Sequence, residues 1–173
     1  MIKFIGLVGM ALAIVCTGYT AASNVKSRVE ELLYVRRLML MFQGELRYKN
    51  AMLSDAFNTV AIRAKGIYKE FFTKLSVATE ENYTMPMSKV FSDNVEKILK
   101  GHTMLSREDL SMLKELGETL GYQDQKMQLA NIDLYIDRVS QSIDESRKKM
   151  VETMKMYRTL GVMGALMSII VFV

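Results

Sequence analysis

The sequence predicts an all-α protein, with a bundle of helices in the middle of the chain and an apolar membrane helix at each end. Three observations support this fold class. The 173 residues contain one proline and few β-branched runs, so little interrupts or competes with helix formation. Apolar residues recur at three- and four-residue spacing, without the alternation that is typical of strands. Finally, residues 4–22 and residues 159–173 carry no charged side chain.

The N-terminal apolar segment is long enough to cross a membrane. Its 19 residues, 4–22, would rise about 28 Å as a helix, close to the roughly 30 Å hydrocarbon core of a bilayer. A cleaved signal peptide is the alternative, with Lys3 as a minimal basic region and residues 20–22 as a cleavage site. Because the apolar run is long for a signal peptide, we expect residues 1–23 to form a transmembrane helix.

The C-terminal apolar segment is shorter. Residues 159–173 alone would span only about 22 Å. A start at Met156, with Arg158 reaching back to the lipid headgroups, lengthens the segment to a plausible crossing. A very apolar core helix of a soluble protein is the alternative. We expect residues 156–173 to form the second transmembrane helix.

Basic residues flank both apolar segments on their inner sides. Those that precede the C-terminal segment are Arg147, Lys148, Lys149, Lys155 and Arg158. Those that follow the N-terminal segment are Lys26, Arg28, Arg36 and Arg37. By the positive-inside rule, residues 24–155 then form a cytoplasmic domain that is held at the cell membrane by both ends. No stripe of Lys and Arg with interleaved aromatics is present, so we expect no nucleic-acid partner despite the net charge of +4.

The apolar pattern predicts six helices in the central domain. The first carries an apolar stripe through residues 32–46, the second through residues 53–64 and the third through residues 68–75. Gly66 is expected to break the chain between the second and third helices. The polar residues 79–84 are predicted to form a loop.

The fourth and fifth helices have recognisable ends. Pro86 suits the first turn of the fourth helix, and Gly101 is expected to end it. Ser106 and Asp109 have the spacing of a capping box, which opens a fifth helix that runs to Leu120. The sixth helix begins close after this point, and its apolar stripe continues almost to the C-terminal segment over about 45–50 Å.

The stretch ELGETLGYQDQ, residues 115–125, joins the fifth and sixth helices and contains two glycines four residues apart. Each glycine costs a helix interior about 1 kcal/mol relative to Ala, so each needs a structural reason. Gly121 is expected to cap the fifth helix, and Gly117 to allow a neighbouring helix to cross closely. Glu118 and Asp124 lie near this joint, where Asp124 would favour the start of the sixth helix through the helix dipole. A working loop with Glu118 as a catalytic acid or metal ligand is the less favoured alternative.

Catalytic and cofactor motifs do not emerge from the sequence. One histidine, His102, and one cysteine, Cys16 in the N-terminal apolar segment, cannot form a zinc site or a Cys–His pair. Phosphate-binding loops, the dinucleotide fingerprint and EF-hand spacing are absent. We therefore expect no catalytic residue, no metal and no cofactor. An unrecognised hydrolase would have to depend on an acid such as Glu118.

GETLGYQDQKMQLANIDLYI (117–136), with its GETLG element, resembles the stage III sporulation protein AB family of endospore-forming bacteria. RTLGVMGALMSIIVF (158–172) resembles the terminal membrane segment of the same family. GELRYKNAMLSDAF (44–57) is similar to a third family region. Within it the matching residues are Glu45, Tyr48, Leu53 and Ala56. Lys49 and Met52 depart from the family, where Gly and Pro are common.

That family in turn resembles the cytoplasmic domain of type II secretion and type IV pilus platform proteins. The resemblance implies an antiparallel six-helix bundle in a secretion-like membrane complex that links mother cell and forespore. It also implies docking of a companion secretion-type ATPase, location in the mother-cell membrane around the forespore, and a possible homo-oligomer. Glu45, Tyr48 and Glu118 would be partner contacts. A two-span extracytoplasmic helical sensor is the alternative function, and it conflicts with the basic flanks.

Overall fold

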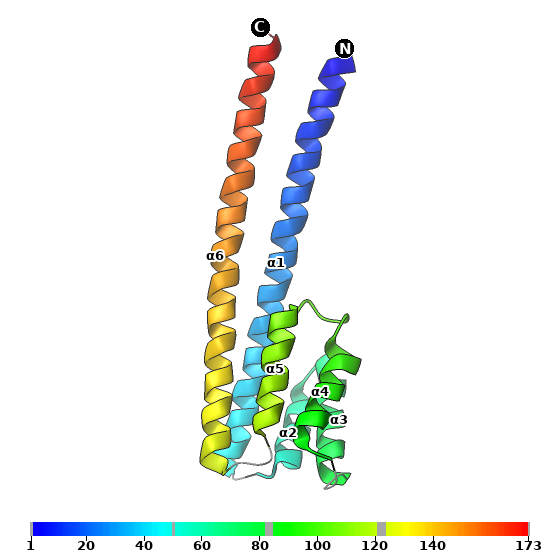
Figure 1. The fold of residues 1–173 in the computed structure, drawn as a ribbon, viewed down its shortest axis with the longest axis vertical. Coiled ribbons are helices and arrows are strands. Elements are labelled where there is room, and N and C mark those ends of the chain that lie inside the picture. Colours follow the sequence, from blue (N-terminus) through cyan, green and yellow to red (C-terminus); the bar gives the residue numbers. More distant parts are fainter. Residues whose placement is uncertain (1, 50, 82–84, 121–123, 173) are drawn as a thin grey trace. The chain divides into compact units, whose positions relative to one another are not determined.

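Over the residues whose backbone it describes, the computed structural model contains six α-helices (Figure 1). The structure describes the backbone of residues 2–49, 51–81, 85–120 and 124–172, and the side chains of 23–48, 51–80, 85–120, 124–157, 159–160 and 163–164. The helices are α1 (Ile2–Lys49), α2 (Leu53–Arg63), α3 (Ile67–Glu81), α4 (Met87–Asn94), α5 (Arg107–Thr119) and α6 (Gln125–Phe172). These described ranges contain no strand, so the predicted all-α class is confirmed.

Two of the helices are much longer than the others. α1 and α6 each contain 48 residues, or about 72 Å at the standard helical rise. Each joins a predicted end segment to a helix of the predicted central domain without a break. Among the side chains that the structure describes, no helix has a stretch long and apolar enough to cross a bilayer. The predicted membrane segments, residues 1–23 and 156–173, lie mostly outside those side chains.

The chain divides into two compact units, which differ from the predicted domains in their boundaries. The central unit is Glu30–Ile143, and the end unit combines Met1–Val29 with Asp144–Val173. Within the end unit, Arg28 Nη1 donates a hydrogen bond of 3.2 Å to Ser146 Oγ, which joins α1 to α6. Ser146 is 2% exposed, so this contact is shielded from water.

The core of the central unit contains a cluster of phenylalanines from four helices. Phe42 of α1 stacks on Phe57 of α2, with ring centroids 4.6 Å apart. Phe71 of α3 meets Phe91 of α4 edge to face at 5.5 Å, and Phe91 also lies 6.3 Å from Phe57. All four rings are at most 1% exposed. Aromatic burial on this scale is a major source of stability, and here it joins α1, α2, α3 and α4.

Local signals in the sequence placed several helix ends correctly. Gly66, between α2 and α3, and Gly101, before α5, adopt φ angles of +58° and +79°, which favour glycine. The predicted capping box is confirmed at the start of α5. Ser106 Oγ accepts a bond of 3.2 Å from Asp109 N, and Asp109 Oδ2 accepts one of 2.8 Å from Ser106 N.

Other boundaries differ from the prediction. α3 continues to Glu81, so the predicted loop 79–84 is wrong at its first three residues, and residues 82–84 lie outside the described part. In this last part of α3 the Thr79 hydroxyl donates to the Leu75 carbonyl at 2.6 Å, so its polar group is bonded within the helix. Pro86 precedes α4 instead of lying in its first turn.

The fourth helix ends in a π-helical turn, Val95–Leu99, that the sequence did not predict. Its last bond runs from Lys100 N to Val95 O at 3.0 Å. Glu96, in this turn, accepts a bond of 2.6 Å from Lys100 Nζ and another from Lys114 Nζ of α5. These bonds, led by that from Lys100, lower the pKa of Glu96 to about 2. Glu96 therefore links the π turn to α5.

Polar side chains of α1 hold the connecting turns. Tyr68 Oη of α3 donates a bond of 2.9 Å to Glu31 Oε1, and Met104 N, in the loop before α5, donates to Glu31 Oε2. Burial and then the Glu31 carboxylate raise the pKa of Tyr68. Tyr34 Oη accepts a bond of 2.7 Å from Lys65 N in the turn after α2. Glu31 and Tyr34 thus attach the turn after α2 and the loop before α5 to α1.

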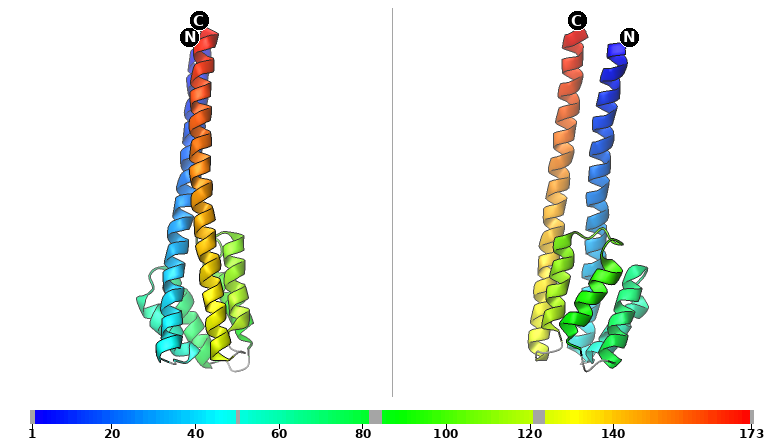
Figure 2. Two further views of the ribbon diagram at one scale, coloured as in Figure 1. Left: turned by 90° about the vertical axis from the view of Figure 1, so that its left-hand side faces the viewer. Right: turned by 45° about the vertical axis from the view of Figure 1, so that its right-hand side comes forward.

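Within the central unit, α1 and α6 run antiparallel side by side (Figure 2). Gln125 Nε2 donates to the Leu46 carbonyl at 2.8 Å, and Arg36 Nε donates to Ser140 Oγ at 2.8 Å. Between these contacts, Asp133 accepts from Arg47 at 3.0 Å and from Gln43. From Gln125 to Ser140 along α6, the partners on α1 run from Leu46 and Arg47 back to Arg36, so these contacts set the register of the two helices.

The crossing of α4 and α5 depends on Gly117. A Cβ at this buried position would lie 2.4 Å from both Cβ and Cγ of Phe91. Because the Phe91 Cβ is fixed to its backbone, a rotamer change cannot relieve the clash. A neighbouring helix therefore crosses where the sequence analysis expected one.

We predict that Gly117→Ala destabilises the chain by about 2 kcal/mol. Because the clash involves a Cβ that cannot move away, its cost lies at the upper end of the roughly 1–3 kcal/mol of overpacking, and the gain in helix propensity of about 1 kcal/mol offsets part of it. Gly44→Ala in α1 is the matched control, because nothing lies within 4 Å of an added Cβ there. That variant should be up to about 1 kcal/mol more stable than the parent chain. Thermal unfolding followed by circular dichroism measures both, and equal stability of the two variants would contradict the close crossing.

We also predict a pH-dependent contribution from Glu96. Because its pKa falls from 4.5 to about 2 on folding, ionised Glu96 stabilises the folded chain above pH 4.5, and this contribution disappears as the pH drops through 2. The melting temperature of Glu96→Gln should thus lie below that of the parent at pH 7 and approach it near pH 2. Glu80→Gln, at an exposed position of α3, is the control. A gap that stays constant with pH would exclude this role.

Candidate protein-interaction surface

The predicted joint between α5 and α6 is a connection between two helices. Glu118 lies exposed in the last turn of α5, and Gly117 beside it is buried. α5 ends at Thr119, and Leu120 follows in an extended conformation. Asp124 is exposed directly before α6, where its carbonyl accepts the bond from Gln128 N at 3.0 Å. The predicted cap at Gly121 lies outside the described residues.

Two of the predicted partner contacts, Tyr48 and Glu45, differ in their exposure to solvent. Tyr48 is 83% exposed near the end of α1, so it is accessible to another protein. Glu45 is only 9% exposed, which makes it a poor contact residue. It lies three residues after Phe42, on the side of α1 that packs into the core. Helical spacing thus places Glu45 with the buried residues, and its role as a partner contact stays a prediction.

The predicted membrane flank belongs to the end unit. Arg147, Lys148, Lys149 and Lys155 are exposed on α6, and the side chain of Arg158 is not among those described. A shallow hollow on this helix is lined by Arg147, Lys148, Val151, Glu152 and Lys155. Three cationic side chains thus share one face of α6 around an apolar residue.

A second hollow lies in the central unit, between α5 and α6. It has a volume of about 70 Å³ and is lined by Met112, Glu115, Leu116, Thr119, Asn131, Leu134, Tyr135 and Arg138. We call this hollow and its lining the α5–α6 groove. Leu116 and Tyr135 are each 4% exposed, whereas Leu134 is 50% exposed. Four of its eight lining residues are apolar or aromatic and four are polar, and the groove is partly open to solvent.

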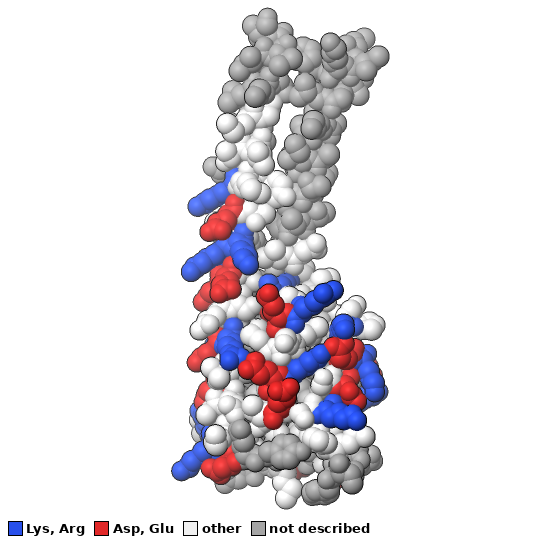
Figure 3. Space-filling model, viewed as in Figure 1, with Lys and Arg blue, Asp and Glu red and all other residues white. Residues whose placement is uncertain are grey.

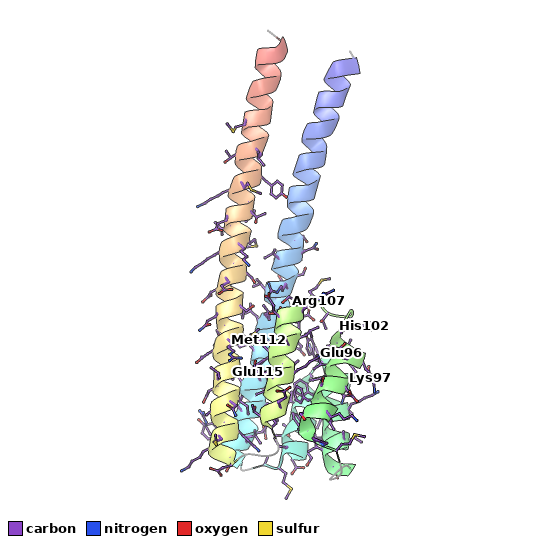
Figure 4. The ribbon with its side chains drawn as sticks, in the orientation of Figure 1. Glu96, Lys97, His102, Arg107, Met112 and Glu115 are labelled. Carbon is purple, nitrogen blue, oxygen red and sulfur yellow. The ribbon has the colours of Figure 1, made fainter. Side chains whose placement is uncertain are left out.

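Acidic side chains border the α5–α6 groove. Glu108, Glu115 and Glu118 are exposed on α5, seven and three residues apart, so they share one side of the helix. Figure 3 shows acidic side chains over α5, and Figure 4 shows Glu115 and Met112 on this helix. Arg138 Nη1 of α6 lies 2.7 Å from Glu115 Oε2. This ion pair bridges the two helices at the edge of the groove.

Buried polar groups also connect the same two helices. Asp109 is 2% exposed and accepts a bond of 3.1 Å from Ser142 Oγ of α6. Burial and then the Asp109 carboxylate raise the pKa of Tyr135. The capping box of α5 is thus also a contact to α6, which fixes the separation of the two helices.

The sequence pattern does not identify the groove residues as a site. One feature of the sequence points to an exposed apolar residue here. Leu134 lies two positions after Ile132, so helical spacing places it outside the buried stripe. Among the described side chains, no group of three or more His, Cys, Asp or Glu could hold a metal ion.

Comparisons with known proteins support the resemblance found in the sequence. The family model for stage III sporulation protein AB matches residues 3–173. The stage III sporulation protein AB of Bacillus subtilis (strain 168) is 22% identical over 170 residues, which cover 98% of both chains. A solved structure of a stage III sporulation protein AB has a similar fold, with a TM-score of 0.64 at 18% identity over 72% of this chain and 97% of that one. The chain therefore belongs to the stage III sporulation protein AB family.

Proposed function

We propose that this chain is a membrane-anchored platform protein in the sporulation complex that links mother cell and forespore. In this role its central unit docks a companion secretion-type ATPase and performs no catalysis itself. The match of the family model to residues 3–173 carries the proposal, because it extends over the central unit and both apolar ends. The likeness of the GETLG element to platform proteins of secretion systems supports the docking role.

Charge and hydropathy support the proposed anchoring. Residues 4–22 and 159–173 are free of charged side chains, and the helices that contain them continue directly into the central unit. The exposed cations of the end unit follow the positive-inside rule if the central unit faces the cytoplasm of the mother cell. Both ends would then hold the central unit at the inner surface of the membrane.

The exposed surface of the central unit supports docking. Glu118 and Tyr48 are both accessible, and neither is needed for the phenylalanine core. Charges at the rim of an interface mainly steer association and set specificity. Exposed acids near the joint would thus guide a partner with a basic surface.

The topology is testable by labelling an introduced cysteine. In a Cys16→Ser background, Asn58→Cys places a thiol at an exposed position of α2. We expect a membrane-impermeant maleimide to leave this thiol unlabelled in intact vegetative cells that express the full chain, and to label it after permeabilisation. Labelling in intact cells would place the central unit outside the cytoplasm and overturn the proposal.

Docking is testable by reversing one charge. We expect Glu118→Lys to weaken binding of the companion ATPase to the full chain in lipid nanodiscs by about three- to tenfold, mainly through slower association. Glu80→Lys, the same change at an exposed position of α3, should bind as the parent does. Biolayer interferometry gives both rates. If the parent chain does not bind the ATPase at all, the docking function is excluded.

A further inference from the structure

We propose that the α5–α6 groove binds an amphipathic helix of a partner protein, whose apolar face enters the groove and whose Lys and Arg residues meet the acidic border. This inference rests on the proposed function and specifies the partner chemistry of the docking surface. It is carried by the shape of the groove, its exposed apolar residues and the charges around it.

The groove has a suitable size for one apolar side chain. Its volume of about 70 Å³ corresponds to about five water-sized groups, on the scale of a Leu or Met side chain. Leu116 and Tyr135 line it from the buried side, and Met112 is half-buried at its edge. A side chain inserted here would contact apolar atoms from two helices.

Exposed apolar residues extend this lining along α6. Leu134 is 50% exposed and Met127, seven residues earlier, is 57% exposed. A spacing of seven returns to nearly the same side of a helix, so both residues form a line parallel to the α6 axis. A helix that docks in a groove presents apolar residues at matching intervals of three, four and seven. This line therefore suits a helix better than an isolated loop.

The charges around the groove determine which type of partner helix can bind. Glu108, Glu115 and Glu118 are exposed on α5, where Arg107 is the one exposed cation among the described side chains, and Asp137 is exposed on α6. Arg138, which lines the groove, is already paired with Glu115 at 2.7 Å. An acidic helix would face these carboxylates at close range, whereas a basic helix would complement them. The occupant is therefore apolar on one face and basic beside it.

The test introduces a charge into the groove and measures binding of the companion ATPase to the full chain in nanodiscs. Leu134→Arg removes an apolar contact and repels a basic helix, so it should weaken binding at least tenfold. Leu134→Glu removes the same contact without that repulsion and should weaken binding less. Val77→Arg, at an exposed apolar position of α3 (45% exposed), should leave binding unchanged. Melting curves check that all three variants fold.

The outcomes separate this inference from the proposed function. If the parent chain binds the ATPase and Leu134→Arg binds as Val77→Arg does, the groove is not the docking site, although the docking function stands. If Leu134→Glu is the weaker binder, the occupant is not basic. If the parent binds no ATPase, both proposals fail. If Leu134→Arg changes the oligomeric state of the chain alone, a second copy occupies the groove and the inference is overturned.

A photo-cross-linking residue at Ser111 identifies the occupant directly. Ser111 is exposed on α5 between Glu108 and Glu115, at the border of the groove. Mass spectrometry of the complex with the ATPase should find the cross-link in one helical segment of the ATPase with an apolar face and flanking Lys or Arg. A cross-link to an acidic segment, or no cross-link in a complex that has formed, would contradict the inference.

Discussion

The packing of Phe91 against the bare backbone of Gly117 is the contact on which the arrangement of the central unit depends. Phe91 contacts Phe71 and lies near Phe57, so the ring belongs to the core formed by α2 and α3 as well as to the crossing with α5. An added Cβ at Gly117 would force α4 and α5 apart. The GETLG element, which begins with this glycine, is therefore a packing element first. Its glutamate, Glu118, is the residue that it presents to solvent.

Polar contacts then position α6 beside α5 and α1. Asp109 combines two roles, since one carboxylate oxygen completes the capping box of α5 and the other accepts from Ser142. Asp133 binds two side chains of α1, which fixes the register of the long helices within the central unit. These contacts fix two sides of α6 and leave the side that carries Met127 and Leu134 exposed. A surface of this kind is suited to recognition because rigid elements hold it in place.

Features set by nearby residues were predictable from the sequence, whereas features set by distant residues were not. Gly66, Gly101 and the Ser106–Asp109 box act through backbone conformation or a three-residue spacing, and the structure shows all of them. The polar run from Thr79 predicts a loop, whereas α3 continues to Glu81 and the Thr79 hydroxyl bonds within this helix. The π turn and the Glu31 contacts depend on residues from other helices. The groove also depends on residues from two helices, since it exists only where α5 and α6 meet, so the sequence pattern alone does not predict it.

We infer that the central unit works by presenting the α5–α6 surface to another protein. Hydrogen–deuterium exchange of the full chain in nanodiscs, with and without the ATPase, shows which surface binds. We expect slower exchange upon binding in the part of the chain from Glu108 to Gln141, on α5 and α6, with α2 and α3 unchanged. Protection confined to α2 and α3, or a complex with no protected segment in the central unit, would contradict it.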